Sequence, residues 1–402
     1  MMGVRPLLPR LPVATVAWRW SRANLFSSPA NTALTIFMVG LLGFAGYQLG
    51  RFVFISGQWD VVEANRGLFM IGRFPREEVW RIWVILHVAS ALAGLSWGAW
   101  GRIGPRLAGI GAAALLPLYV FLLEGDAIVL TTTCLVLFAG GYAAGHTSPP
   151  AINPRFRTAM TFAWPLAFAF SMYMLSAVPD RLWGGLLLTM TLAVVGIVAS
   201  FPLGVALAVG RASTFPVIRT FCVAYIELIR GVPLITVLFM SGFILPLAIG
   251  TDRDILGIPV TGYLPSEVGL AMVGLTAFTA AYVAEIVRGG LQAVPRSQVE
   301  AGQALGLGGV RLLILIVLPQ ALRAVIPALV SQFISLFKDT SLVFILALTD
   351  LLRAARAATA QPDFIGQQAE VLIFAGLIYW VVAFSMSRAS QQLERNLGVG
   401  ER

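Results

Sequence analysis

The chain has 402 residues, of which 58% are hydrophobic and only 12% are charged, and its formal net charge at pH 7 is +9. Because soluble domains carry about 25% charged residues, this composition excludes an ordinary soluble protein and indicates an integral membrane protein. The basic residues lie between apolar runs rather than in one patch. We therefore interpret them as determinants of membrane topology and expect no nucleic-acid partner.

Residues 1–30 hold four arginines ahead of the first apolar run, which is too long for the hydrophobic part of a signal peptide. We therefore predict a cytoplasmic segment, 1–30, followed by a retained first span. Ten apolar runs have about the length of 20 residues that a helix needs to cross a bilayer. They cover residues 31–55, 82–100, 107–123, 127–144, 158–178, 184–209, 219–248, 265–286, 322–346 and 369–388. The runs lack the alternation of strands, so the sequence predicts an all-α integral membrane protein with about ten transmembrane helices.

Arginines are distributed unequally between the two sets of loops that these spans would define. If the N-terminus lies inside, the inside segments hold 18 arginines and the outside loops hold 9. Because loops on the cytoplasmic side carry the excess of basic residues, both termini are predicted to be cytoplasmic.

The chain is predicted to divide near residue 180. Residues 31–180 form an extension of about five short spans without intramembrane charge, and a scaffold role is the default expectation for them. Residues 181–390 form a second set of five spans, and residues 391–402 form a cytoplasmic tail. Two GxxxG pairs in the extension suit helix packing, but in a chain with 40 glycines we attribute them to chance: Gly46–Gly50 and Gly141–Gly145.

Residues that could form a disulfide or a metal site are few and scattered. Cys134 and Cys222 lie inside apolar runs, and His87 and His146 have no companions at ligand spacing. We therefore predict neither a disulfide framework nor a metal site. A membrane-embedded enzyme would need a clustered nucleophile, base or metal, and the sequence offers none.

The segment 289–321 predicts a short helix held outside the membrane between two spans. Pro295 ends the preceding helix, and Ser297 with Glu300 forms a capping box at which a new helix begins. Gly306 and the glycines after it supply a chain reversal, after which an apolar helix re-enters the membrane. On local physics alone, the segment could equally be a capped connector in which Glu300 serves only as a cap.

The spacing of residues in this segment resembles the EAA loop of ABC importer permeases. The one departure is Gly302, where the family usually has alanine; glycine keeps the small volume but lowers helix propensity by about 1 kcal/mol. The resemblance implies that six residues couple the chain to an ATPase: Glu300, Ala301, Gly302, Gly306, Leu318 and Pro319.

The resemblance widens on both sides of the EAA loop. Residues 225–234 (YIELIRGVPL), 281–290 (AYVAEIVRGG) and 333–343 (FISLFKDTSLV) are similar to the polar amino-acid branch of these permeases, which includes histidine, glutamine and general L-amino-acid importers. This implies that 181–390 forms the type I ABC importer (MetI-like) permease core. The long N-terminal half resembles the extended permeases of general L-amino-acid importers.

The function that the resemblance implies is that of a permease subunit in an ATP-driven importer of L-amino acids. A Walker A loop needs Lys followed by Ser or Thr, and the only lysine, Lys338, precedes Asp339. We therefore expect no enzyme activity from this chain and place ATP and Mg²⁺ on a partner ATPase dimer. A second, paralogous permease and a periplasmic amino-acid-binding protein complete the expected complex in the bacterial inner membrane.

Lys338, Asp339, Thr340 and Ser341 are the candidates for the pore and the substrate. An unpaired charge within a span costs at least about 2.5 kcal/mol, and an amino acid brings one carboxylate and one ammonium group that Lys338 and Asp339 could complement. Adjacent helix positions point about 100° apart, however, so the two cannot both line one pore face. The alternative is that both pair with protein groups and hold subunits in register.

Two further pairs of charges lie near the predicted cytoplasmic boundary. Glu227 with Arg230, and Glu285 with Arg288, are each three residues apart on one helix face, where a local ion pair forms easily. We interpret both pairs as anchors at the base of the pore.

The nearest alternative function is that of an ion-coupled secondary transporter. Such a transporter would use broken helices, and Pro202 and Pro233 could kink the helices in which they lie. The EAA spacing would then be a coincidence. Uncoupling by a protonophore separates this alternative from an ATP-driven importer.

Overall fold

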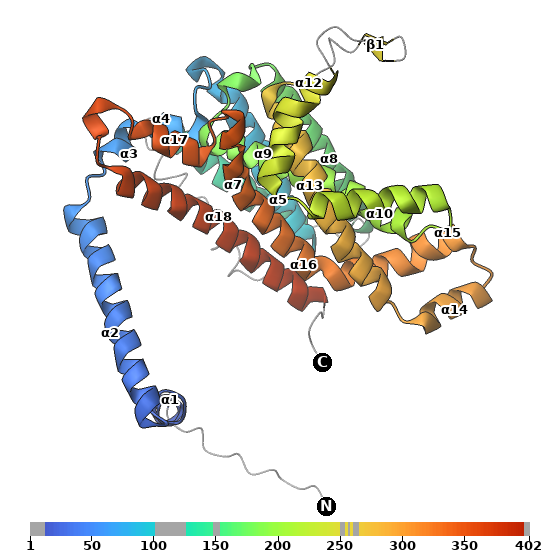
Figure 1. The fold of residues 1–402 in the computed structure, drawn as a ribbon, viewed down its shortest axis with the longest axis horizontal. Coiled ribbons are helices and arrows are strands. Elements are labelled where there is room, and N and C mark those ends of the chain that lie inside the picture. Colours follow the sequence, from blue (N-terminus) through green and yellow to red (C-terminus); the bar gives the residue numbers. More distant parts are fainter. Residues whose placement is uncertain are drawn as a thin grey trace, which may run out of the picture. The chain divides into compact units, whose positions relative to one another are not determined.

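The computed structural model describes residues 13–100, 126–147, 153–249, 254–255, 258–259 and 265–397. These residues are almost entirely helical (Figure 1). They divide into two compact units, Met1–Trp59 and Asp60–Arg402. This division lies far from residue 180, because most of the predicted extension belongs to the same compact unit as the predicted core.

The first unit contains α1 (Val13–Asn24) and α2 (Pro29–Arg51), which continues as a π-helical turn, Phe52–Ser56. Ser28 caps α2 by accepting a hydrogen bond from the Asn31 backbone N–H, and Pro29 begins the helix where a missing N–H costs nothing. Pro29–Ser56 is long and apolar enough to cross a membrane. No residue of α2 is buried within the described chain.

The second unit begins with two short helices and a helical bundle. α3 (Asp60–Ala64), α4 (Arg66–Ile71) and a 3₁₀ turn lead to α5 (Val79–Trp100), which packs against α7 (Asp126–His146) and α8 (Asn153–Ser176).

Glycines allow α5 and α7 to touch through their backbones. A Cβ added at Gly141 would lie 2.7 Å from the Ala91 carbonyl oxygen, and one at Gly145 would lie 2.5 Å from the Leu95 carbonyl oxygen. Our attribution of Gly141–Gly145 to chance was therefore wrong, since this pair permits the close approach. A Cβ added at Gly46 or Gly50 would meet no heavy atom within 4 Å among the described residues.

The remaining helices of the second unit form its larger core. In chain order they are α9 (Gly185–Arg211), α10 (Pro216–Arg230), α11 (Leu234–Phe239), α12 (Leu245–Ile249), α13 (Glu267–Ala293), α14 (Arg296–Ala304), α15 (Gly309–Leu312), α16 (Leu318–Asp339), α17 (Leu351–Ala358) and α18 (Gln368–Leu397). A two-stranded hairpin, β1 (Asp254–Ile255) and β2 (Ile258–Pro259), precedes α13. α13 packs against both α9 and α16, around fully buried residues such as Leu188, Leu275 and Leu336.

Among the described residues, eight helices are long and apolar enough to span a membrane, and one further pair of helices forms a broken span. They match nine of the ten predicted runs. The remaining predicted run, 107–123, lies outside the described residues. The span predicted at 322–346 is longer than expected, because α15, a π-helical turn, α16 and a 3₁₀ turn continue without a break from Gly309 to Leu346.

The predicted span 219–248 is not one straight helix. α10 ends at Arg230, α11 begins at Leu234, and the axis bends by 110° between them. Pro233 lacks a backbone N–H and disfavours a helical conformation at the residue before it. The predicted run 219–248 is therefore interrupted at Pro233, and its two helices are long and apolar enough to cross a membrane only when taken together.

The second unit has two ends that differ in how they are held together. At one end, which we call the α17 end, α3 and α4 pack on α9, α17 and α18. The rings of Phe69 and Phe374 meet edge to face, with their centroids 5.3 Å apart. Gln361 Nε2 donates a hydrogen bond to Asn65 Oδ1 at 2.7 Å. The start of the extension therefore packs directly on the core.

Gly185, at the first position of α9, lies at the centre of the α17 end. It has φ +57°, and its backbone N–H donates to the Thr349 carbonyl at 2.8 Å. A Cβ at this position would meet the carbonyl oxygens of Leu68 and Phe69. Both its backbone angle and its surroundings therefore require glycine.

Candidate functional site

The predicted EAA segment projects from the core beyond α13, as Figure 1 shows for α14 and α15. α13 ends at Ala293, and Pro295 is the N-cap of α14, with no side-chain cap. The predicted capping box was therefore wrong, because the helix begins at Arg296 and Ser297 already lies inside it. Gly306, at φ +77°, confirms the predicted chain reversal.

Gly302 is the only buried residue of α14. A Cβ added there would approach the Leu312 side chain and lie 3.0 Å from Ile316 Cδ1, so glycine lets α14 lie close against the next helical segment. Glu300 and Ala301, by contrast, are exposed, as is Pro319; Leu318 is partly buried. The segment thus binds its own chain through Gly302 and presents Glu300 outward.

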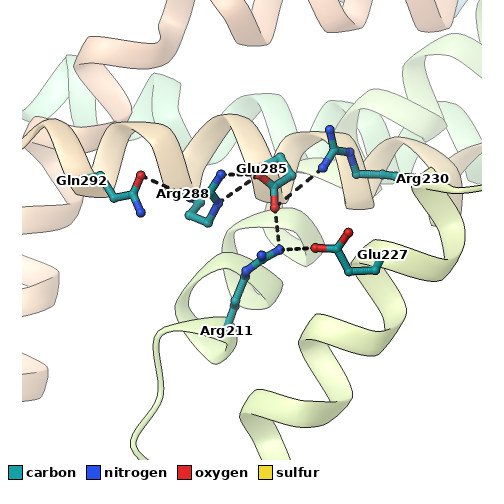
Figure 2. A network of polar contacts seen from close by, with 6 residues as sticks. All are labelled: Arg211, Glu227, Arg230, Glu285, Arg288 and Gln292. Atoms are coloured by element: carbon teal, nitrogen blue, oxygen red, sulfur yellow. Dashed lines mark hydrogen bonds and ion pairs between the residues drawn. The ribbon is translucent and has the colours of Figure 1, made fainter.

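A network of ion pairs joins α9, α10 and α13 at the end of the core from which α14 projects, which we call the α14 end (Figure 2). Glu285 is its centre and is only 14% exposed. Its carboxylate accepts from Arg211 Nη1 at 2.6 Å and from Arg288 Nη2 at 2.7 Å, and Arg230 Nη1 lies 3.7 Å away. Arg211 Nη1 also lies 3.2 Å from Glu227 Oε1.

Of the two predicted local pairs, Glu285–Arg288 is confirmed and Glu227–Arg230 is wrong. Glu227 pairs with Arg211, whereas Arg230 faces Glu285. The guanidinium carbon of Arg230 lies 5.3 Å from the centroid of the Tyr282 ring. Sequence reasoning missed Arg211 because it lies 74 residues from Glu285. The available signal was a single arginine in the last turn of a long apolar helix.

Lys338 and Asp339 lie at the end of α16, where the helix tightens into the 3₁₀ turn Thr340–Leu346. Lys338 is exposed and Asp339 is partly buried. The hydroxyls of Thr340 and Ser341 donate to the backbone carbonyls of Phe337 at 2.7 Å and Lys338 at 2.9 Å. Both hydroxyl protons are therefore already engaged by the backbone, although the oxygens remain able to accept.

A pocket of about 390 Å³ lies at the α17 end and was not predicted. We call it the Arg356 pocket; its lining residues are Ser341, Phe344, Asp350, Leu352, Arg353, Arg356 and Ala357. Of the predicted substrate residues, only Ser341 lines it. The missed signal was Asp350 directly before a short helix with arginines at positions three apart, LLRAARAA.

Asp350 is fully buried at the N-cap of α17. Its carboxylate accepts from the backbone N–H groups of Leu352 at 3.0 Å and Arg353 at 3.2 Å, and from the Tyr379 hydroxyl at 3.4 Å. Burial raises the pKa of the Asp350 carboxyl above its usual range, while these hydrogen bonds act in the opposite direction. Asp350 therefore fixes the start of α17 and the direction in which its arginines point.

Comparison with known proteins places this arrangement in a family. A profile described as "Binding-protein-dependent transport system inner membrane component" matches residues 200–399. The inner membrane amino-acid ABC transporter permease protein YhdY of Escherichia coli K12 is 38% identical over 399 residues, which is 95% of this chain and 93% of YhdY. The chain belongs to this family, in its amino-acid branch. The predicted resemblance is thereby confirmed, and the almost entirely helical structure of the described residues agrees with the predicted all-α class.

Two further relatives differ in length. The glutamate/glutamine/aspartate/asparagine transport system permease protein BztC of Rhodobacter capsulatus is 34% identical over 99% of the permease and 96% of BztC. The glutamate/aspartate import permease protein GltK of Escherichia coli O6:H1 is 38% identical over 52% of the permease and 91% of GltK. The permease therefore shares its long form with YhdY and BztC, while GltK corresponds to about half of it.

Proposed function

We propose that the permease is the transmembrane subunit of an ATP-driven importer of polar L-amino acids. The observation that carries this proposal is α14, a short helix between Pro295 and Gly306 that exposes Glu300 and Ala301 while Gly302 packs on the following segment. The names of YhdY, BztC and GltK support amino acids as the substrate class.

In this proposal, the exposed face of α14 docks on a partner ATPase, and the resulting motion passes into α13 and α16. Glu300, Ala301 and Gly306 contribute the docking face and its turn, Gly302 holds α14 against the next helical segment, and Leu318 and Pro319 begin the helix through which the motion enters the core. ATP and Mg²⁺ act on the ATPase dimer. The ion-pair network around Glu285 anchors the three helices at the base of the pore.

The remaining partners and the orientation belong to the same proposal. A second permease, a paralogue of this one, completes the pore, and a periplasmic amino-acid-binding protein delivers the substrate. The excess of arginines in the predicted inside segments supports a cytoplasmic α14 end, cytoplasmic termini and an α17 end that faces the periplasm. The complex would then lie in the inner membrane of a bacterium.

The test is Glu300→Lys in the purified complex reconstituted into vesicles with its ATPase. Glu300 is exposed, so the variant should fold and reach the membrane, yet it reverses the charge that α14 presents. We expect ATP-dependent amino-acid uptake to be lost. Glu77→Lys, at an exposed position in the 3₁₀ turn Arg76–Glu78, is the matched control and should transport normally.

Normal uptake by Glu300→Lys would contradict the coupling role of α14. Uptake that continues without ATP and stops when a protonophore collapses the proton gradient would instead support the ion-coupled secondary transporter.

A further inference from the structure

Two guanidinium groups line the Arg356 pocket. Arg353 and Arg356 are three residues apart on α17, so their side chains share one helix face. In the described part of the chain, neither forms an ion pair. Arg353 Nη1 makes only a long hydrogen bond to the Leu348 carbonyl, at 3.5 Å, and Arg356 is exposed.

The one carboxylate in the pocket wall cannot neutralise these arginines directly. Both oxygens of Asp350 already accept hydrogen bonds from the backbone of α17 and from Tyr379. Asp350 instead lies in the buried wall of the pocket, while Arg353 is partly buried and Arg356 is exposed. Ser341 adds a hydroxyl oxygen that can accept from a ligand.

This arrangement of charges matches one class of amino acid. A dicarboxylic amino acid carries two carboxylates, and the pocket wall offers two guanidinium groups. Guanidinium groups bind carboxylates through paired, charge-assisted hydrogen bonds. A pocket of about 390 Å³ is within the range of small-ligand sites, roughly 300–1,000 Å³. A basic amino acid would instead bring its second positive charge against Arg353 and Arg356.

We propose that the Arg356 pocket is a subsite that selects amino acids with an anionic side chain, of the aspartate and glutamate class, as they approach the pore. This inference rests on the proposed importer function and on the α17 end facing the binding protein. Arg356 contacts the side-chain carboxylate and Arg353 contacts the α-carboxylate. Asp350 is a positioning residue, since it sets the first turn of α17.

The test compares uptake of L-glutamate with that of L-glutamine, which has the same shape but no side-chain charge. The complete complex, with its ATPase, partner permease and binding protein, is reconstituted into vesicles, and KM and kcat are measured for Arg356→Gln. We expect the KM for L-glutamate to rise about tenfold or more, since one charge-assisted contact is lost. The KM for L-glutamine should change less than about twofold.

Two variants control for a general effect on folding or on surface charge. Arg181→Gln removes an exposed arginine from the 3₁₀ turn Asp180–Leu182, away from the pocket lining, and should leave both substrates unaffected. Arg356→Lys keeps the charge but loses the paired geometry, so it should restore part of the preference for L-glutamate.

The outcomes separate this inference from the importer function. Wild-type uptake that needs ATP but includes no acidic amino acid, or an equal effect of Arg356→Gln on both substrates, would overturn the subsite and leave the importer intact. Absence of ATP-dependent uptake of any amino acid by the wild-type complex would overturn both.

Discussion

The α17 end and the α14 end of the second unit are held together by different forces. At the α17 end, buried rings, backbone hydrogen bonds and glycines in close contact join the extension to the core. At the α14 end, α9, α10 and α13 meet through five charged side chains, four of them at least 25% exposed. Close packing tolerates little displacement, whereas ion pairs near water exchange partners at small cost. The second unit of this permease is therefore held by close packing at one end and by ion pairs, which can exchange partners, at the other.

The largest expected effect comes from breaking the α17 end at Phe69. This ring is completely buried against Phe374, and Phe69→Ala should reduce the free energy of unfolding by about 3–5 kcal/mol. The midpoint of thermal unfolding in detergent is the measurement. Phe54→Ala, at a site that is 85% exposed, should have almost no effect. Equal shifts for the two variants would show that the extension does not support the core.

Gly185→Ala tests whether the close approach of α4 to α9 matters beyond backbone conformation. Gly185 combines a positive φ with contact to the carbonyls of Leu68 and Phe69, so alanine should cost about 2–4 kcal/mol of unfolding free energy. Gly366→Ala has a positive φ but open space around it and should cost only about 1–2 kcal/mol. If thermal unfolding shows the same loss for both, the close contact is unimportant.

Glu285→Gln tests how much the ion pairs at the α14 end contribute to stability. It removes the charge that Arg211, Arg230 and Arg288 share, at a cost of about 1–3 kcal/mol. Because the arginines are partly exposed, the loss should shrink in 1 M salt, where charges are screened within about 3 Å. The double variant with Arg211→Ala should lose less stability than the sum of the two single variants. Strict additivity, measured by thermal unfolding, would show that the two residues do not interact.

Gly302→Ala should have the smallest effect. Alanine raises helix propensity by about 1 kcal/mol, while its methyl group must displace the flexible end of the Leu312 side chain. The two effects oppose each other, so the unfolding midpoint and the uptake rate should both remain within error of the wild type. A fall of several degrees would mean that the departure from the family's alanine is required by packing.

Features with a short-range cause were predictable from the sequence. The spans follow from the length of apolar runs, and the reversal at Gly306 follows from a glycine that can adopt a positive φ. The membership of the family was evident from spacing within residues 300–319. In each case, the residues that determine the feature are neighbours in the chain.

Features that depend on distant residues were not predictable. The partner of Glu227 is Arg211 rather than Arg230, because the orientation of α10 after the break decides which side chains meet. The Arg356 pocket forms only when the 3₁₀ turn after α16 lies beside α17. Likewise, no local pattern indicates that Phe69 packs on Phe374, about 300 residues further along the chain.

The unbroken helical run Gly309–Leu346 has a mechanical consequence. At 1.5 Å per residue its 38 residues measure about 57 Å, nearly twice the hydrocarbon thickness of a bilayer. One end carries Leu312 and Ile316, on which α14 rests, and the other carries Ser341 and Phe344, in the wall of the Arg356 pocket. The two regions therefore belong to one continuous helical run, so a change in the winding of the π-helical turn Leu313–Val317 would alter the distance between them.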